Sequence, residues 1–376
     1  MRVERRLRQP RWLVVAVPAG SLLFALVAAG IVLLATGHDP LSTYRQLFDA
    51  AFLQPGALGQ TLTQATPRGF TGLAAAVAFR MKLFNIGGEG QLYLGSITAA
   101  AAGLYLGGTG GASAFVIAAM VVAGAAGGAA WALIPAILRA FFKTNEIITS
   151  LMLNYVAGTL LTYLVFNSES YWRQTTGFNA SVFPTSKPLP NSAIWPGLTI
   201  HAQGSILVPL GAGIAVALAV LLWVLNSRTR FGFEVQVLGD SVRAGRYAGM
   251  RTRRKILSVM AISGAVAGIG GASQVGDFAH SIDADPNGLQ KQYYGYTGIV
   301  VAALARYNPL AVVIVAFLIG GLQNAGNTLQ GADFPSGLVG MLQGIILFSA
   351  LGGELLVRYR VRFGRRVAAA APGAAG

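Results

Sequence analysis

The chain has 376 residues, of which 54% are hydrophobic and only 11% charged, and its mean hydropathy is +0.59. Because soluble domains carry about 25% charged residues, this composition indicates a membrane protein. The chain contains no cysteine, which excludes disulfides, thiol catalysis and zinc sites with cysteine ligands. Its three histidines, His38, His201 and His280, lie far apart in the sequence, so no metal site is predicted.

A membrane-spanning helix needs about 20 predominantly apolar residues. Ten segments of this chain are candidates for spans, and several of them are short or interrupted by glycine. In chain order they are residues 12–35, 58–79, 92–106, 112–138, 147–166, 205–225, 256–275, 296–305, 310–323 and 336–351. Arginines precede the first segment as in a signal peptide, but its apolar run exceeds the roughly 7–15 residues of a signal sequence, so we expect an uncleaved span. The sequence therefore predicts an all-α, polytopic membrane protein of about ten helices.

Basic residues gather on one side of the membrane when these ten segments are threaded with the N-terminus inside. Most of the 28 Lys and Arg residues then lie in the cytoplasm, whereas about half of the 13 acidic residues lie outside. This asymmetry matches the positive-inside rule. We therefore expect a basic cytoplasmic tail at residues 1–11, a membrane domain at 12–351 and a second basic cytoplasmic tail at 352–376. The net charge of +15 then reflects topology, and no nucleic-acid partner is predicted.

Residues 83–91, LFNIGGEGQ, interrupt the apolar sequence with three glycines, an amide pair and a carboxylate. An ionised side chain at membrane depth costs about 2.5–3.5 kcal/mol on insertion scales unless something compensates it. Broken backbone survives there only against protein or a water-filled cavity. The stretch therefore predicts a polar pathway, and its position beside Arg80 and Lys82 favours a cytoplasmic gate over a mid-membrane pocket. Those two cations would balance Glu89.

Glycine is abundant elsewhere in the chain, with 49 residues in all. Small residues let membrane helices approach each other closely. The glycine-rich segments 124–130 and 264–271 are therefore predicted to be helix-packing seams with no substrate role.

Residues 167–204 form an external segment rich in Ser, Pro and Asn. Aromatic residues are spread along it, namely Tyr171, Trp172, Phe178, Phe183 and Trp195. Because tyrosine and tryptophan favour the membrane–water interface, this segment is predicted to lie on the membrane surface as a cap. The alternative is a docking surface for an external protein.

Residues 226–255 form a basic cytoplasmic segment. Within it, Asp240 or Ser241 can cap a short helix that runs to Tyr247 and ends at Gly249. Contact with anionic lipid would explain the arginines alone. A capped helix bounded by glycines is more structure than lipid attraction requires, so we expect a rigid contact with a cytoplasmic protein.

No energy source is evident in the chain. It has no G-x-x-x-x-G-K-[ST] loop for a nucleotide phosphate, no HExxH motif and no Ser/His/Asp constellation. The acids expected at membrane depth are few, Glu89 and Glu146, whereas ion-coupled carriers usually show intramembrane carboxylates or matching half-helices. Transport powered by a separate subunit is therefore favoured. An ion-coupled secondary carrier is the alternative, and a membrane enzyme is disfavoured.

Four stretches in this order carry a family resemblance. They are residues 83–91 (LFNIGGEGQ), 145–157 (NEIITSLMLNYVA), 231–249 (FGFEVQVLGDSVRAGRYAG) and 295–309 (GYTGIVVAALARYNP). Together they resemble the permease subunits of bacterial ABC importers for nucleosides, simple sugars and branched-chain amino acids, over about residues 58–351. The second stretch is most similar to nucleoside permeases, and ribose or galactose permeases match it less closely. One departure is Pro67–Arg68, where an apolar residue is expected; Arg68 would pair with Glu89 or Glu146.

The resemblance implies a ten-span, type II importer permease in the bacterial inner membrane. Two permeases, in this case a heterodimer, would form the pathway, above cytoplasmic ABC ATPases that bind ATP and Mg. An external lipoprotein would deliver a nucleoside, or alternatively a simple sugar such as ribose or galactose, and this chain itself would bind no cofactor. Residues 231–249 resemble the coupling helix that meets the ATPase. The positions concerned are Phe231, Gly232, Glu234, Gly239, Asp240, Arg243, Arg246, Tyr247 and Gly249.

Substrate contact is predicted for polar side chains that both donate and accept hydrogen bonds, as ribose hydroxyls and base edges require. These are Asn85, Glu89, Gln91, Asn145, Glu146 and Asn154, with Phe84 and Tyr155 as stacking or gating surfaces. Two alternatives stay open. Asn154 and Gln91 could bond neighbouring helices together, and Asn145 with Glu146 could cap the fifth span. The external acids Asp283 and Asp285 would pair with basic residues of the binding protein.

Overall fold

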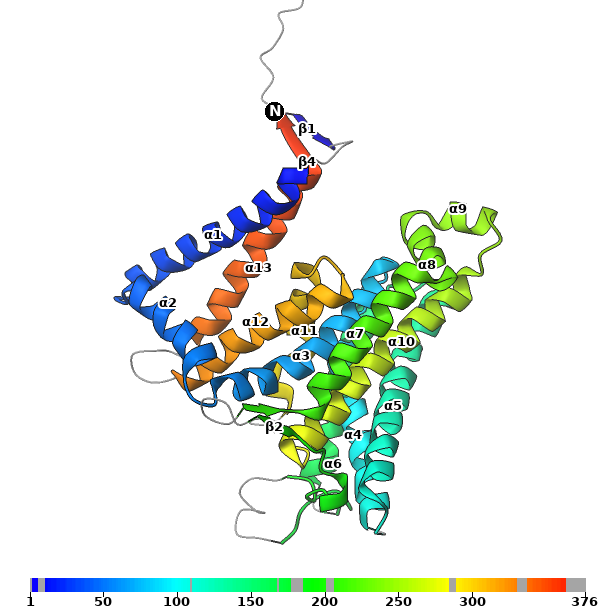
Figure 1. The fold of residues 1–376 in the computed structure, drawn as a ribbon. Coiled ribbons are helices and arrows are strands. Elements are labelled where there is room, and N and C mark those ends of the chain that lie inside the picture. Colours follow the sequence, from blue (N-terminus) through cyan, green and yellow to red (C-terminus); the bar gives the residue numbers. More distant parts are fainter. Residues whose placement is uncertain are drawn as a thin grey trace, which may run out of the picture. The chain divides into compact units, whose positions relative to one another are not determined.

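The computed structural model describes residues 2–5, 11–108, 110–167, 169–176, 185–200, 206–283, 289–329 and 337–362. Figure 1 shows that these residues are mostly helical. The chain divides into two units, one made of residues 1–43 with 337–376 and the other of residues 44–336.

The first unit brings the two ends of the chain together. Helix α1 (Arg11–Ala35) packs against α13 (Gly337–Arg358). Beyond them, strand β1 (Arg2–Arg5) pairs antiparallel with β4 (Tyr359–Arg362), with Arg2 opposite Arg362. Residues 2–5 and 359–362 therefore lie together at one end of this unit, and residues 352–358 of the predicted tail continue α13. Helix α2 (Pro40–Phe48) leads out of the unit.

The second unit is built around two buried helices, α3 (Ala57–Arg80) and α10 (Thr252–Ser273). Around them pack α4 (Gly88–Gly108), α5 (Ser113–Phe142), α7 (Leu210–Arg228), α11 (Tyr294–Leu304) and α12 (Pro309–Thr328). Helix α6 (Glu146–Phe166) lies against α4 and α5. Phe70, Leu73 and Met260 form part of the apolar core between α3 and α10.

Each of the ten predicted segments corresponds to a helix of the structure, although some of the predicted ends differ. Among the described residues, five helices are long and apolar enough to span a membrane, namely α5, α6, α7, α12 and residues Thr252–Ala279, which continue α10 through the π-helix η3 (Gln274–Ala279). Residues 23–53 qualify only as a bent pair of helices, in which the π-helix η1 (Asp49–Leu53) continues α2. Helix α11 is short, as predicted. Helices α3 and α4, which carry Arg68 and Glu89, are not among the five, and most of α3 is buried inside the bundle.

The glycine seams between α5 and α10 are confirmed. A Cβ atom added at Gly268 would meet backbone atoms of Gly124 and Gly128 at 3.0 Å or less, and one at Gly264 would meet Gly128. Only glycine permits this approach of two helix backbones, because any side chain would push them apart.

Two of the predicted segments differ from the structure. The segment predicted as a span from residue 205 begins as strand β3 (Ile206–Val208), which pairs with β2 (Leu198–Ile200), and the helix starts only at Leu210. Its apolar, β-branched residues suit a strand as well as a helix. The segment 226–255, predicted as a loop with one short helix, contains two helices, α8 (Arg230–Asp240) and α9 (Val242–Tyr247).

The external segment also departs from the surface cap that the sequence predicts. Trp195 is only 3% exposed, belongs to the second apolar core and lies against Gly276. Tyr171 is exposed, with Lys187 Nζ 3.6 Å from its ring centroid. Short 3₁₀ helices follow, η2 (Asn191–Ala193) in this segment and η4 (Leu289–Gln292) later in the chain. Phe178, Phe183 and Asp285 lie outside the described residues.

Candidate functional site

The stretch 81–87 is a non-helical connector between α3 and α4. Lys82 adopts a left-handed conformation with φ 56° just after α3, and helix α4 begins at Gly88. Asn85 is buried in this connector and exchanges two 2.9 Å hydrogen bonds with the amide of Gln91. Its Nδ2 also donates to Ser263 Oγ on α10, at 2.9 Å. The amide pair therefore fastens the connector to the bundle.

Glu89 joins the first turn of α4 to the beginning of α11. The side chain is 2% exposed, and Tyr93 donates its hydroxyl to Oε1 at 2.6 Å. The backbone N–H groups of Gly295 and Tyr296 donate to Oε2, the latter at 3.3 Å. These N–H groups lie at the N-terminal end of α11, where the helix leaves donors unsatisfied and favours negative charge. Glu89 thus supplies the buried acceptor that this short helix needs.

Asn154 holds the same region from α6. Its Nδ2 donates to the carbonyl oxygen of Ile86 at 2.9 Å and to the hydroxyl of Tyr296 at 3.3 Å, while Oδ1 accepts from the N–H of Gly90. The geometry shows that Asn154 bonds neighbouring helices together, whereas Gln91 bonds Asn85 in the connector that precedes its own helix. Contact with substrate stays a prediction for both.

Arg68 is buried and does not pair with Glu146. Its Nη1 donates to the carbonyl oxygen and to the Oε1 of Gln64, and its guanidinium lies 4.8 Å from the ring centroid of Tyr294. Among the described contacts, no direct ion pair joins Arg68 to Glu89. Arg68, which stands where an apolar residue is expected, is thus accommodated as a cation that packs on an aromatic ring.

Arg80 and Lys82, predicted to balance Glu89, have other partners. Lys82 Nζ lies 3.2 Å from Asp240 Oδ1 in an exposed ion pair. Arg80 Nη2 donates to the carbonyl oxygen of Asn226 at 3.2 Å. The balance prediction is wrong because both side chains turn toward α7 and α8, and Glu89 is compensated by hydrogen bonds instead.

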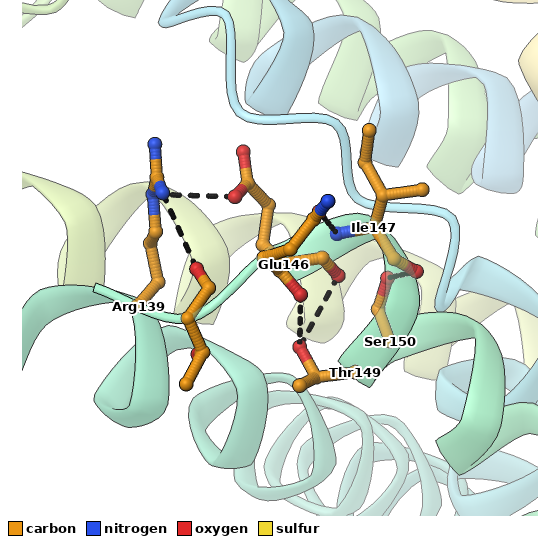
Figure 2. Close-up of polar contacts among 7 residues, drawn as sticks. Arg139, Glu146, Ile147, Thr149 and Ser150 are labelled. Carbon is orange, nitrogen blue, oxygen red and sulfur yellow. Dashed lines mark hydrogen bonds and ion pairs between the residues drawn. The ribbon is translucent and has the colours of Figure 1, made fainter. Parts of the chain in front are cut away.

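Glu146 is the first residue of α6 (Figure 2). Asn145 is the N-cap, and its Oδ1 accepts from the N–H of Ile147 at 2.9 Å. The Glu146 carboxylate points toward Arg139 at the end of α5, with 3.2 Å between Nε and Oε2. The capping alternative therefore describes this corner, since an acid in the first helical turn also suits the helix dipole. A pathway role for either residue stays a prediction.

Aromatic residues form the exposed part of this region. Phe84 is half-exposed and packs near Phe79, with ring centroids 5.3 Å apart. Tyr155 is exposed on α6. Tyr293 and Tyr296, which the site prediction missed, lie within three residues of each other around Gly295, the glycine that opens the stretch GYTGIVV. Their spacing around Gly295 could have marked them.

The α8–α9 pair forms a second candidate surface. Ser241 caps α9 by accepting from the N–H of Ala244, and Gly249 ends it at φ 76°, as predicted. Gly245 is buried against Leu238 of α8, whereas the rest of the α9 surface is exposed and Tyr247 is 97% exposed.

The base of this pair is braced by charged and aromatic contacts. Glu234 forms a 2.7 Å ion pair with Lys255, whose Nζ also lies 4.3 Å from the ring of Phe231. Gly232 is buried against the backbone of Asn226. Arg243 and Arg246 are exposed with Tyr247, so α9 presents a basic and aromatic surface from a firmly held base.

A small cavity lies beside the end of α10, away from the residues described above. It measures about 100 Å³ and is lined by polar and apolar side chains, among them Gln274, Ser281, Asp283 and Gln292. Pockets for small ligands usually measure about 300–1,000 Å³, so this cavity is too small to enclose a nucleoside. Among the described residues, no three His, Asp or Glu side chains gather where they could hold a metal ion.

Comparison with known proteins places this arrangement in a family. A family model described as the permease component of branched-chain amino acid transport systems matches residues 57–351. The chain belongs to this permease family. It is 32% identical to a glucose ABC transporter permease of Haloferax volcanii, over 96% of this chain and 93% of that protein. It is also 32% identical to a guanosine ABC transporter permease of Bacillus subtilis, over 92% and 94% of the two chains.

A nucleoside ABC transporter permease of Lactococcus lactis is 28% identical over 89% of this permease and 90% of its own length. The chain is accordingly a transport subunit and not an enzyme. With its long apolar helices, it is a multi-pass protein of the inner membrane. Membership of this family also implies an ATPase and a substrate-binding protein as partners.

Proposed function

We propose that this permease carries nucleosides through the membrane, after delivery by an external binding lipoprotein and with energy from a cytoplasmic ABC ATPase. The observation that carries the ATP-driven mechanism is the α9 surface. Tyr247, Arg243 and Arg246 project from a short capped helix whose opposite side is packed on α8. An exposed tyrosine flanked by arginines is the composition enriched at the centres of protein interfaces.

Nucleosides are favoured by the relatives that transport them. Permeases for guanosine and for nucleosides match this chain over about nine-tenths of its length. A simple sugar is the second candidate, because the glucose permease is as similar as the guanosine permease. Related importers with two different nucleoside permeases support a heterodimer, since Lactococcus lactis and Bacillus subtilis each have two relatives of this chain.

An ion-coupled carrier fits the described geometry poorly. Such a carrier needs an intramembrane carboxylate that exchanges its partner for an ion. Glu89 is occupied by three donors and Glu146 by Arg139. Asp277, which the structure places in the span Thr252–Ala279, accepts from the hydroxyl of Ser273 and from the N–H of Gly211 on α7. These acids are therefore engaged in holding helices.

Co-purification with the ATPase tests the role of α9. Tyr247→Ala combined with Arg243→Glu should abolish recovery of the ATPase with the permease and reduce ATP-driven uptake to background. Tyr105→Ala is the control, because Tyr105 is also a strongly exposed tyrosine, near the far end of α4. Full ATPase recovery with the double variant would show that α9 is not the docking element.

A further inference from the structure

Three tyrosines gather on the surface of the second unit, and they are called here the tyrosine cluster. Tyr293 and Tyr296, at the beginning of α11, have ring centroids 6.2 Å apart. Tyr155 directly follows Asn154 on α6, and Asn154 Nδ2 donates to the hydroxyl of Tyr296 at 3.3 Å. Tyr155 is 66% exposed and Tyr293 59% exposed, so their rings are open to whatever passes this surface.

Helix lengths indicate that the tyrosine cluster lies near the middle of the membrane, deeper than the cytoplasmic gate predicted for residues 83–91, whose Glu89 bonds Tyr296. Tyr155 is halfway along the 21 residues of α6. Helix α11 has 11 residues, or about 16 Å, roughly half of the hydrocarbon core, so its N-terminal end also lies near mid-depth. Tyrosines that anchor helices in lipid occur at the membrane–water interface. A phenol hydroxyl facing hydrocarbon at mid-depth would lack hydrogen-bond partners, which disfavours lipid as the occupant of this surface.

The buried network described above fixes the cluster in place. Tyr296 is held at both ends, because its N–H donates to Glu89 and its hydroxyl accepts from Asn154. Tyr293 has φ 49°, a left-handed conformation that bulky residues rarely adopt and that places its ring beside that of Tyr296. The polar residues at this depth therefore build a fixed aromatic surface.

We propose that the tyrosine cluster is the surface over which the aromatic base of the cargo stacks during transit, which makes these tyrosines specificity-determining residues. This inference rests on the proposed nucleoside function. Every nucleobase has a π-face that stacks on aromatic rings, and phenol hydroxyls can both donate to and accept from base edges. An open surface of this kind guides a base without enclosing it, which suits a permease that must release its cargo.

Substitutions that remove or retain the ring test the proposal in the complete transporter, reconstituted with its ATPase, second permease and binding protein. The probe is radiolabelled guanosine, measured as uptake per ATP hydrolysed. Tyr155→Leu and Tyr293→Leu should each lower this ratio about tenfold, as expected when one base–aromatic stack is lost. Tyr155→Phe and Tyr293→Phe should keep it within about twofold, because the ring remains. ATP hydrolysis should be unchanged in all four variants.

Tyr163→Leu is the matched control, since Tyr163 is an exposed tyrosine two turns farther along α6 and should leave uptake unchanged. Normal guanosine uptake by the leucine variants would overturn the proposal. Loss of the second permease from the purified complex would overturn it as well, by showing that the cluster is a subunit contact. A separate outcome is that the wild-type transporter takes up glucose but not guanosine. That outcome would contradict the proposed nucleoside function itself.

Discussion

Single residues in this permease do structural work at positions where the sequence suggests substrate contact. Glu89 is the clearest case. Its carboxylate accepts from the Tyr93 hydroxyl and from two backbone N–H groups at the beginning of α11. A buried acid so placed is compensated by hydrogen bonds and by the helix dipole, which explains why it can lie deep in a membrane protein.

Glu89→Gln should destabilise the permease. A glutamine side chain has one acceptor oxygen, whereas the glutamate carboxylate has two. The NH₂ group of the glutamine would therefore face another hydrogen-bond donor, either the Tyr93 hydroxyl or an N–H group of α11. Leaving such a buried donor unsatisfied costs about 1–3 kcal/mol. Thermal unfolding in detergent should show a lowered midpoint. Glu169→Gln, at an exposed external position, should unfold as the wild type does, and an unchanged midpoint for Glu89→Gln would refute the anchoring role.

The sequence indicated which side chains matter near Glu89 but not what they bind. Polar residues in an apolar run must be compensated, and that rule identified Asn85, Glu89, Gln91 and Asn154. Their partners come from elements as distant as α10 and α11, for example Ser263 and Gly295. No local pattern predicts such pairings, because they depend on how the helices pack.

At the scale of elements, the helices were predictable and their ends were not. Apolar runs of helical length marked the ten segments, and glycine-rich runs marked the α5–α10 seam. The strand β3 and the helix α8 were missed, because a short apolar run and a mixed basic segment carry no clear period. In α9, by contrast, the capping serine and the terminal glycine specify both ends locally.

The α5–α10 seam gives a test at this scale. Gly268→Ala should destabilise the permease by about 1–3 kcal/mol, because the added methyl overpacks two helix backbones. Gly213→Ala is the control, since a Cβ at Gly213 on α7 meets nothing within 4 Å and alanine favours the helix. Thermal unfolding of the two variants checks this, and equal midpoints would contradict the seam.

The contact between α8 and the end of α3 gives a second test. A Cβ at Gly239 would lie 2.6 Å from the carbonyl oxygen of Arg80. Gly239→Val should therefore displace α8, so that the ATPase still binds α9 while ATP-driven uptake is lost. Gly249→Ala strains a left-handed residue by about 1–2 kcal/mol but meets open space, and its effect should be smaller. Normal uptake by Gly239→Val would exclude this contact from coupling.

At the scale of the whole molecule, charge predicts orientation. The tails at β1 and β4 pair with each other, so both ends lie on one side of their unit, and the positive-inside rule assigns that side to the cytoplasm. The absence of cysteine makes this prediction easy to test, because any introduced thiol is unique. Ala244→Cys on α9 should react with a membrane-impermeant maleimide only in inside-out vesicles, and Glu169→Cys only in right-side-out vesicles. The reverse pattern would invert the topology.

The central claim is that this permease imports nucleosides with energy from a separate ATPase. The most direct measurement is uptake of radiolabelled guanosine into proteoliposomes that contain the permease, its partner permease, its ATPase and its binding protein. We expect uptake that requires ATP and the ATPase and that is absent when this chain is reconstituted alone. Guanosine uptake by the chain alone, driven by an ion gradient without ATP, would contradict the account.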